Sequence, residues 1–357
     1  MSEEKSVRLV SGGDVEFAIR PKDLPSVSAP EVQAALDYLK QGDLCFMNCE
    51  MGLSCGGYRI PKVFNIRSDP SFVEDLVSMG IQGVSLANNH VMDFGHEALF
   101  ETLATIDAAG IPRTGAGHNL EESLRPCYLE AKGQRFAFIG VAATLPPASA
   151  ADVDRPGIAP IHVITSYEAD PGWLAEGPGG APIVHTQANQ QDVDWVCAAI
   201  VAAKRKADHV IIAPHWGVNK NRVAPQQSQV AEYQPPLGKA FIDAGADIVL
   251  GMHTHNLLGI EVYKGKPIFY SLGNFIFQPL HTTIMEPESV IVLADFAGES
   301  MRMSLVPILS NVDGFASLPS PAGREQVYKR LQEQSRPFGT QFSMGGDGII
   351  KLRLGVE

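Results

Sequence analysis

The chain has 357 residues, of which 45% are hydrophobic and 19% are charged, and its formal net charge at pH 7 is -12. This composition is typical of a globular protein with enough apolar residues for one large domain or two ordinary ones. The acidic charge argues against general binding to nucleic acid or to an anionic membrane surface. We therefore expect neither nucleic acid nor a membrane as a partner.

The cellular location is predicted from the N-terminal residues and the cysteines. The polar N-terminus leads directly into a strand-like segment, without the apolar region of a signal peptide. No apolar run approaches the roughly 18 residues that a membrane-spanning helix needs. The cysteines are odd in number and lack a Cys-x-x-Cys pair, which favours reduced thiols. Together these features predict a cytoplasmic protein.

Strand-like and helix-like segments alternate along most of the chain. This alternation, followed by consecutive strands, predicts an α/β fold with layers of mixed sheets. A hairpin is expected at 259–272, with its turn at Lys264-Gly265-Lys266. Strands are expected at 7–19 (broken at Gly12-Gly13-Asp14), 44–48, 83–87, 135–143, 209–213, 246–250, 289–296 and 301–308, and helices at 30–40, 71–79, 97–109, 192–206 and 237–244.

We expect residues 1–357 to form a single domain, because the sequence shows no internal repeat and no low-complexity linker. The stretch from 145 to 182 is rich in proline, glycine and alanine, and is a candidate lid or insertion. Residues 301–357 are expected to add a C-terminal extension of strand and helix.

Several of the expected strands end in residues that can bind a metal ion. His253 and His255 follow an apolar strand, and their i, i+2 spacing places both imidazoles on one side of an extended chain. Taken singly, such residues are more often turn or surface residues. In open α/β sheets, however, ligand sites lie beyond the carboxyl ends of the strands. The other strand-end residues are Asp14, Glu50, Asn88, Asn89, His90 and His215.

Longer motifs resemble those of the CapA family of capsule and poly-γ-glutamate biosynthesis proteins. The motifs run in order from Gly12 to Phe277 and are Ser85-Leu86-Ala87-Asn88-Asn89-His90-Val91-Met92-Asp93-Phe94-Gly95, Gly115-Ala116-Gly117-His118-Asn119, His215-Trp216-Gly217, 245–251 and 270–277. That family is similar to the calcineurin-like metallophosphoesterases. The resemblance therefore implies a four-layer α/β/β/α sandwich with a calcineurin-like metallophosphatase fold and a two-metal site.

The resemblance also implies that a set of side chains binds divalent metal, as two ions of manganese, zinc or iron. It assigns Asp14 as the first aspartate ligand, Glu50 as the bridging carboxylate, Asn89 as the asparagine ligand, His215 as the isolated histidine, and His253 and His255 as the closing Gly-x-His-x-His motif.

Two positions depart from the metallophosphoesterase pattern. The first motif is Asp14-Val15-Glu16, where Asp-x-His is usual, so Glu16 either replaces the histidine or faces the core. Glu50 is one methylene longer than the usual aspartate. These departures leave open a different metal preference or a single ion.

Residues beside the ligands are candidates for catalysis and substrate binding. His90 is predicted to protonate a leaving group or stabilise the transition state. Asp93 is predicted to orient the His90 imidazole, although it equally suits a cap of the following helix. Lys62, Arg67 and Arg222 are candidates for binding a phosphate or carboxylate, with a solvated charged face as the alternative.

We favour a metal-dependent hydrolase that acts on a small or polymeric anionic substrate. Activated water at such a site can cleave a phosphoester or a γ-glutamyl or other amide bond. One alternative is a non-catalytic component of capsule biosynthesis that binds an anionic polymer, but the missing membrane anchor counts against it. Another is a soluble enzyme of a small-molecule pathway.

Overall fold

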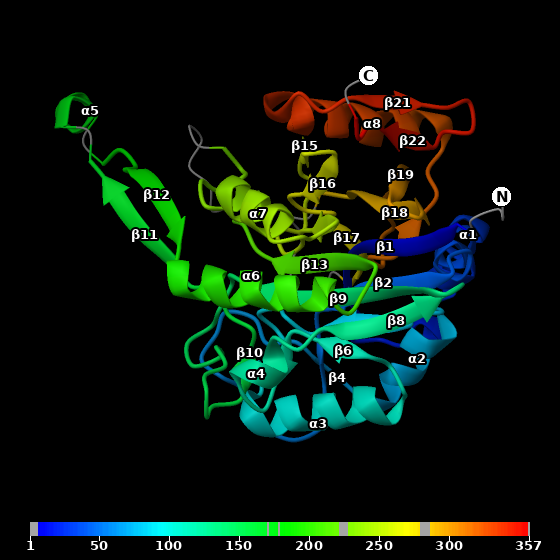
Figure 1. Ribbon diagram of the computed structural model, residues 1–357, viewed down its shortest axis with the longest axis horizontal. Coiled ribbons are helices and arrows are strands. Elements are labelled where there is room, and N and C mark those ends of the chain that lie inside the picture. The colour runs from blue at the N-terminus through cyan, green and yellow to red at the C-terminus, as the bar shows by residue number, and fades with distance from the viewer. Residues whose placement is uncertain (1–5, 170, 178, 221–227, 279–285, 356–357) are drawn as a thin grey trace.

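The computed structural model describes residues 6–169, 171–177, 179–220, 228–278 and 286–355 (Figure 1). These residues form a ten-stranded sheet and a six-stranded sheet, together with three short two-stranded ladders. In this part of the chain, no helix combines the length and the apolar character that crossing a membrane requires.

The ten-stranded sheet contains the N-terminal strand at its centre. Strand β1 (Val7–Glu16) is parallel to β2 and β17 and antiparallel to β18. Because β2, β5 and β6 also run parallel to one another, the carboxyl ends of β1, β2 and β5 lie at one edge. The order is β21 (Phe342–Met344), β22 (Ile350–Leu352), β19 (Ser300–Ser310), β18 (Glu288–Ala297), β1, β2 (Leu44–Cys49), β5 (Gly83–Ser85) and β6 (Arg113–Thr114), with β17 (Asn274–Phe277) beside β1 and β20 (Ala316–Ser317) beside β19.

The six-stranded sheet supplies the second half of the sandwich. Its inner strands β16, β14, β13 and β9 are parallel, so their carboxyl ends also share one edge. The order is β15 (Ile260–Tyr263), β16 (Lys266–Phe269), β14 (Ile248–Leu250), β13 (His209–His215), β9 (Gln134–Ala142) and β8 (Cys127–Ala131). The β15–β16 pair is the hairpin that the sequence predicts, turning at Lys264-Gly265.

Three apolar clusters separate four layers of structure. The first lies between the ten-stranded sheet and helices α1 (Pro30–Lys40), α2 (Val73–Ser78) and α3 (Gly95–Ala108). The second lies between the two sheets, where the rings of Phe46 and Phe138 stack with centroids 4.3 Å apart. The third packs the six-stranded sheet against α6 (Gln190–Lys204) and α7 (Gln234–Asp243). The predicted α/β/β/α sandwich is confirmed.

The alternation of side chains along β9 explains how one strand serves two clusters. Phe136 and Phe138 face the other sheet, whereas Ala137 and Ile139 face the helices. Both faces of the strand are therefore apolar, as expected for a parallel strand that is covered on both sides. The same pattern holds in β13, which is buried up to its last residue, His215.

Most predicted helices and strands are found with shifts of a few residues at their ends. The predicted helix at 71–79 begins as a 3-10 turn at Pro70–Phe72 and continues as α2. The predicted break at Gly12-Gly13-Asp14 is instead a shift of register between β1 and β2, inside a continuous strand. Short elements near the helices of the first layer and the connecting loops are β3 (Gly52–Leu53), β4 (Arg67–Ser68), β7 (Ala116–Gly117), α4 (Leu120–Ser123) and β10 (Gly157–Ile158).

The stretch predicted as a lid or insertion leads into a projecting hairpin. Strands β11 (Val163–Glu168) and β12 (Ile183–Ala188), joined through α5 (Pro171–Glu176), extend away from the layered body (Figure 1). His185 lies 3.0 Å from a carboxylate oxygen of Glu168 and 3.1 Å from one of Glu232, which connects the hairpin to the start of α7. A role as a lid stays a prediction.

The C-terminal segment packs onto the sandwich. Its first strand, β19, pairs with β18 along almost its whole length. Helix α8 (Pro321–Ser335) places Val327 and Leu331 in the cluster between the sheets. The single-domain prediction remains a proposal, which these contacts support.

Gly13 allows the close approach of β1 to the loop before β17. A Cβ atom at this position would lie 2.0 Å from the carbonyl oxygen of Gly273, closer than any real contact. We expect Gly13→Ala to lower the free energy of unfolding by about 1–3 kcal/mol, because backbone must move. Urea titration measures the change. Gly346→Ala, where a Cβ meets nothing within 4 Å, is the control, and an equal effect in both variants would contradict the explanation.

Candidate metal centre

The carboxyl ends of strands from both sheets meet at one place and carry the predicted ligands. Asp14 lies near the end of β1, and Glu50 directly follows β2. Asn89 lies in the loop after β5, His215 ends β13, and His253 and His255 lie in the loop after β14. All six side chains are brought together, and their role as ligands stays a prediction.

Two overlapping groups of donor atoms form at this edge. Glu50, His215 and His253 make one group, and Asp14, Glu50 and His255 make the other. In each group the donor atoms lie within 4.8 Å of one another. Glu50 belongs to both groups, and its role as a bridging carboxylate stays a prediction.

The first group converges on Nε2 of His215. This atom lies 3.2 Å from Oε1 of Glu50, 3.1 Å from Nδ1 of His253 and 2.7 Å from Oδ1 of Asn89. The arrangement therefore offers two imidazole nitrogens, one carboxylate oxygen and one amide oxygen, a donor set that suits zinc, iron or manganese.

The second group is richer in carboxylate. Nδ1 of His255 lies 3.6 Å from Oδ2 of Asp14, and its Nε2 lies 4.0 Å from Oε1 of Glu50. Oδ1 of Asn274 lies 2.9 Å from the same Nδ1 of His255. Asn274 is therefore placed to fix the orientation of the His255 ring.

The loop that carries His253 and His255 has an unusual backbone. Both histidines have positive φ, at 103° and 55°, in a region that non-glycine residues rarely adopt. The preceding Gly251 has no room for a side chain, because a Cβ would lie 2.3 Å from the carbonyl oxygen of Phe269. The backbone N–H of His253 donates a hydrogen bond to Oδ2 of Asp14 at 3.1 Å. Such strain is often concentrated at functional sites.

Asn48 and Asn88 support the predicted ligands. The sequence named Asn88 only as a strand-end candidate for metal binding and gave no role to Asn48. Nδ2 of Asn48 donates to Oδ1 of Asp14 at 2.8 Å and lies 3.3 Å from Nδ1 of His215. Oδ1 of Asn88 accepts hydrogen bonds from the backbone N–H groups of His90 and Val91. The signal for Asn48 was a polar residue inside an apolar strand, two positions before Glu50.

Burial changes the ionisation of the whole cluster. It raises the pKa of Asp14 to about 8, with a further rise from the neighbouring Glu50, and raises the pKa of Glu50 well above its usual value. Burial also lowers the pKa of His215 to about 4 and that of His255 to about 3. A nearby cation would oppose the rise in the carboxylate pKa values by stabilising the carboxylates, and it would keep the imidazoles neutral.

The unpaired oxygens at this site fit a bound cation. Glu50 is fully buried, yet neither of its carboxylate oxygens has a hydrogen-bond partner among the described residues. Oε1 of the buried Glu16 has none either. Because buried polar atoms are normally paired, these oxygens and the adjoining imidazoles fit a bound cation as their partner.

His90, Asp93 and Lys62 form a second cluster beside the ligands. Nδ1 of His90 lies 2.6 Å from Oδ2 of Asp93, which also accepts the backbone N–H of Ile66 at 2.7 Å. Helix α3 has no side-chain cap at its N-terminus, so Asp93 does not cap it. Burial lowers the pKa of His90, which favours a neutral imidazole with its proton on Nδ1 facing Asp93.

Lys62 is oriented into this second cluster. Its Nζ donates to Oδ1 of Asp93 at 2.6 Å and to the backbone carbonyl of Asn89, and lies 3.0 Å from Nδ1 of His90. Lys62 therefore holds the Asn89 loop and the Asp93 carboxylate in place. A substrate-binding role for Lys62 stays a prediction, and these contacts occupy much of its capacity to donate hydrogen bonds.

Lys62→Met should destabilise the protein, because a buried carboxylate would lose its cation. We expect the free energy of unfolding to fall by about 1–3 kcal/mol, and the Lys62→Met/Asp93→Asn double variant to recover part of that loss. Chemical denaturation measures both. Lys220→Met, which removes an exposed lysine paired with Glu286, should stay within about 0.5 kcal/mol of the wild type. Equal losses in the two lysine variants would contradict the account.

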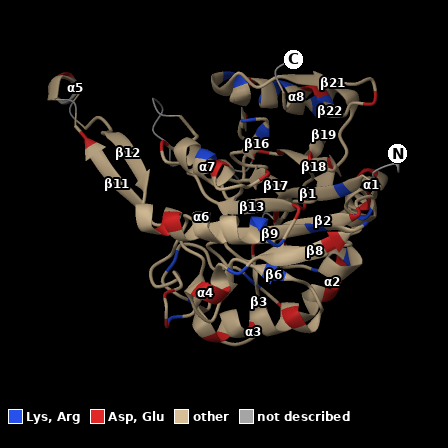
Figure 2. Cartoon of the chain, in the orientation of Figure 1, with Lys and Arg blue, Asp and Glu red and all other residues tan. Residues whose placement is uncertain are grey.

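Arg67, another predicted substrate-binding residue, does not lie in this cluster. Arg67 is exposed, donates to the carbonyl oxygens of Cys55 and Gly56, and lies 4.1 Å from the centroid of the Phe94 ring. Arg222 lies outside the described residues. The segment from 51 to 68 carries Arg59, Lys62 and Arg67 and no acidic residue, whereas Figure 2 shows acidic positions along α3 and α4.

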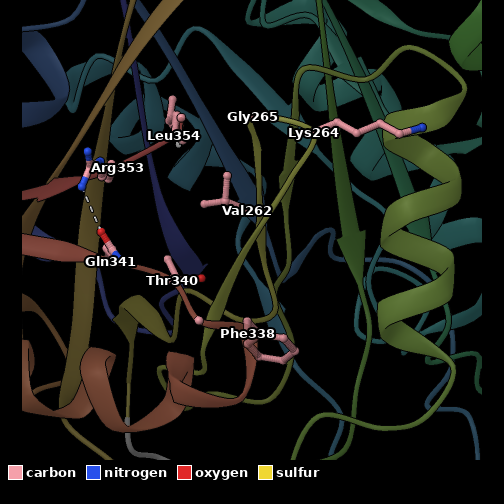
Figure 3. A pocket seen from close by; sticks show the side chains of 10 residues that line it. Val262, Lys264, Gly265, Phe338, Thr340, Gln341, Arg353 and Leu354 are labelled. Atoms are coloured by element: carbon pink, nitrogen blue, oxygen red, sulfur yellow. Dashed lines mark hydrogen bonds between the residues drawn. The ribbon is translucent and has the colours of Figure 1, made fainter. Parts of the chain in front are cut away.

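A separate cavity of about 500 Å³ lies between the β15–β16 hairpin and the C-terminal strand (Figure 3). Lys264 extends away from it and pairs with Asp243, and Arg353 donates to Oε1 of Gln341. None of the predicted metal ligands lines this cavity, and we assign it no role in the metal centre.

The fold and the site define the class of this protein. It is a four-layer α/β/β/α sandwich with histidines and carboxylates gathered at its strand ends. The sequence profile described as "Bacterial capsule synthesis protein PGA_cap" matches residues 8–279. The chain belongs to this family, which is part of the metallophosphoesterase-like superfamily.

Two sequence relatives agree with this assignment. The chain is 32% identical to a "Probable polyglutamine synthesis accessory protein" of Mycobacterium tuberculosis, over 87% of this chain and 77% of that protein. It is 27% identical to the "Capsule biosynthesis protein CapA" of Bacillus anthracis, over 82% of this chain and 63% of that protein. A crystal structure of a hypothetical protein from Thermus thermophilus aligns with 84% of this chain and 99% of its own, at a TM-score of 0.43 and 16% identity.

Proposed function

We propose that the protein is a metal-dependent hydrolase whose site holds two divalent ions and cleaves a phosphoester or a γ-glutamyl or other amide bond of an anionic substrate. The observation that carries the proposal is that two donor groups share the buried carboxylate of Glu50. Bound ions of manganese, zinc or iron would lower the pKa of water and stabilise negative charge on oxygen.

The chain's own residues supply the rest of the site. Asn48 and Asn274 hold Asp14 and His255 in position through their side-chain amides. His90, oriented by Asp93, is placed to transfer a proton or to stabilise charge on the reacting group. The basic segment from 51 to 68 offers local positive charge to an anionic substrate.

The family and its relatives suggest where such an activity is used. Relatives are named for capsule biosynthesis and for polyglutamine synthesis. An anionic polymer or a fragment of one is therefore the substrate that we propose to test first. Binding of such a polymer without cleavage is the alternative function.

The test combines metal analysis with a hydrolysis screen. Chelator-treated protein is reloaded separately with manganese, zinc or iron(II), and bound metal is counted by mass spectrometry. Each form is then offered phosphate esters, γ-glutamyl amides, small amides and poly-γ-glutamate, with His215→Ala as the metal-site control.

The expected result is two ions per chain and turnover of one substrate class, both lost in His215→Ala. Metal-loaded protein that binds poly-γ-glutamate but cleaves nothing would favour the non-catalytic alternative. Unchanged metal content in His215→Ala would show that the ligand assignment is wrong.

A further inference from the structure

Glu16 is a buried carboxylate with one oxygen left unpaired. Only 1% of the residue is exposed. Oε2 accepts a hydrogen bond from the backbone N–H of Gln278 at 3.1 Å, whereas Oε1 has no hydrogen-bond partner among the described residues. Because such atoms are normally paired, Oε1 requires a partner that the described residues do not supply.

The strand geometry directs Glu16 toward the metal ligands. Val15 and Phe17 belong to the apolar cluster beneath the helices that cover the ten-stranded sheet. Successive side chains of a strand point to opposite faces, so Glu16 points away from that cluster and shares its face with Asp14. Glu16 is also close enough to Glu50 for its charge to raise the pKa of that residue.

The two donor groups differ in what completes them. Asn89 adds an amide oxygen to the group of Glu50, His215 and His253. At the second group, the amide oxygen of Asn274 is already engaged by Nδ1 of His255. Among the described histidines, cysteines and carboxylates, none joins Asp14, Glu50 and His255 within the 4.8 Å that defines the group. Glu16 thus lies beside the less complete group but outside direct reach of it.

We propose that Glu16 completes this second group by accepting, on Oε1, a hydrogen bond from a water molecule on the ion that Asp14, Glu50 and His255 hold. The inference rests on the proposed metal-dependent function and adds a residue to that site. Glu16 is a positioning residue in this role, since it acts on the ion through a water. Partners of this kind typically contribute about 10–100-fold to metal affinity.

The test is a titration of manganese into the chelator-treated full chain by calorimetry. Glu16→Gln keeps an oxygen acceptor and removes the charge, whereas Glu16→Met removes both. We expect one of the two dissociation constants to rise about 10-fold in Glu16→Gln and up to about 100-fold in Glu16→Met. The other constant should change by less than about threefold, because Asn89, His215 and His253 are untouched.

Two controls separate this role from a structural one. Asp192→Asn alters a buried carboxylate outside the site, which bonds His162, and should leave both constants unchanged. The visible absorption of the cobalt-loaded chain should change in Glu16→Met and not in Asp192→Asn, because it reports the surroundings of the ion.

The outcomes distinguish this inference from the proposed function. If both Glu16 variants bind two ions with wild-type constants while Glu50→Gln loses metal, the role of Glu16 is wrong and the metal site stands. If Glu50→Gln also keeps both ions, the metal site itself is wrong, and the role of Glu16 falls with it.

Discussion

Glu50→Gln should abolish binding of both metal ions and with it any hydrolysis. Glu50 is the one residue common to the two donor groups among the described residues. Exchanging its carboxylate for an amide removes a negative charge from both groups at once. Since metal ions contribute several kcal/mol of transition-state stabilisation and each 1.36 kcal/mol is tenfold in rate, we expect turnover to fall by about 1,000-fold or more.

A thermal measurement tests the same substitution without a substrate. Metal present at 100 times its dissociation constant stabilises a protein by about 2.7 kcal/mol, so the wild-type melting temperature should rise with added metal. The Glu50→Gln melting temperature should not respond. Glu261→Gln is the matched control, because Glu261 lies outside the site and pairs with Lys239. If added metal raised the melting temperature of Glu50→Gln as much as that of Glu261→Gln, the assignment of Glu50 as a bridging ligand would be wrong.

The convergence of the predicted ligands could be foreseen from the way parallel strands are arranged. Asp14, Glu50 and His215 each stand at the end of an apolar run, and parallel strands bring such ends to one edge. The alternation of strands and helices predicted layers of mixed sheets, and the family resemblance implied the four-layer order. Local sequence therefore determined the edge at which the site forms.

The sequence could not predict contacts made by segments that are distant in the chain and lack a periodic apolar pattern. Lys62 lies in an irregular loop, so nothing in its neighbourhood predicted that Nζ would bond Asp93 rather than remain free for a substrate. The side on which Glu16 lies depended on a register shift in β1 that two adjacent glycines make possible. The hairpin of β11 and β12 was missed because its strands are mostly exposed and lack a buried apolar face.

His90→Ala should slow hydrolysis by about 100- to 10,000-fold while leaving both metal ions in place. The reason is that His90 belongs to neither donor group, yet it lies close enough to His253 to affect the pKa of that ligand. The 2.6 Å contact with Asp93 fixes the ring, so proton transfer and charge stabilisation are lost when the imidazole is removed.

The chain provides a matched control for this substitution. His162 contacts the buried carboxylate of Asp192 through Nδ1 at 2.7 Å, the same pairing as His90 with Asp93 but outside the metal centre. His162→Ala should therefore keep wild-type turnover, and metal content measured by mass spectrometry should be equal in both variants. Loss of metal in His90→Ala would make His90 a ligand or a support for the ligands. Full activity together with full metal content would show that the His90 imidazole takes no part in catalysis.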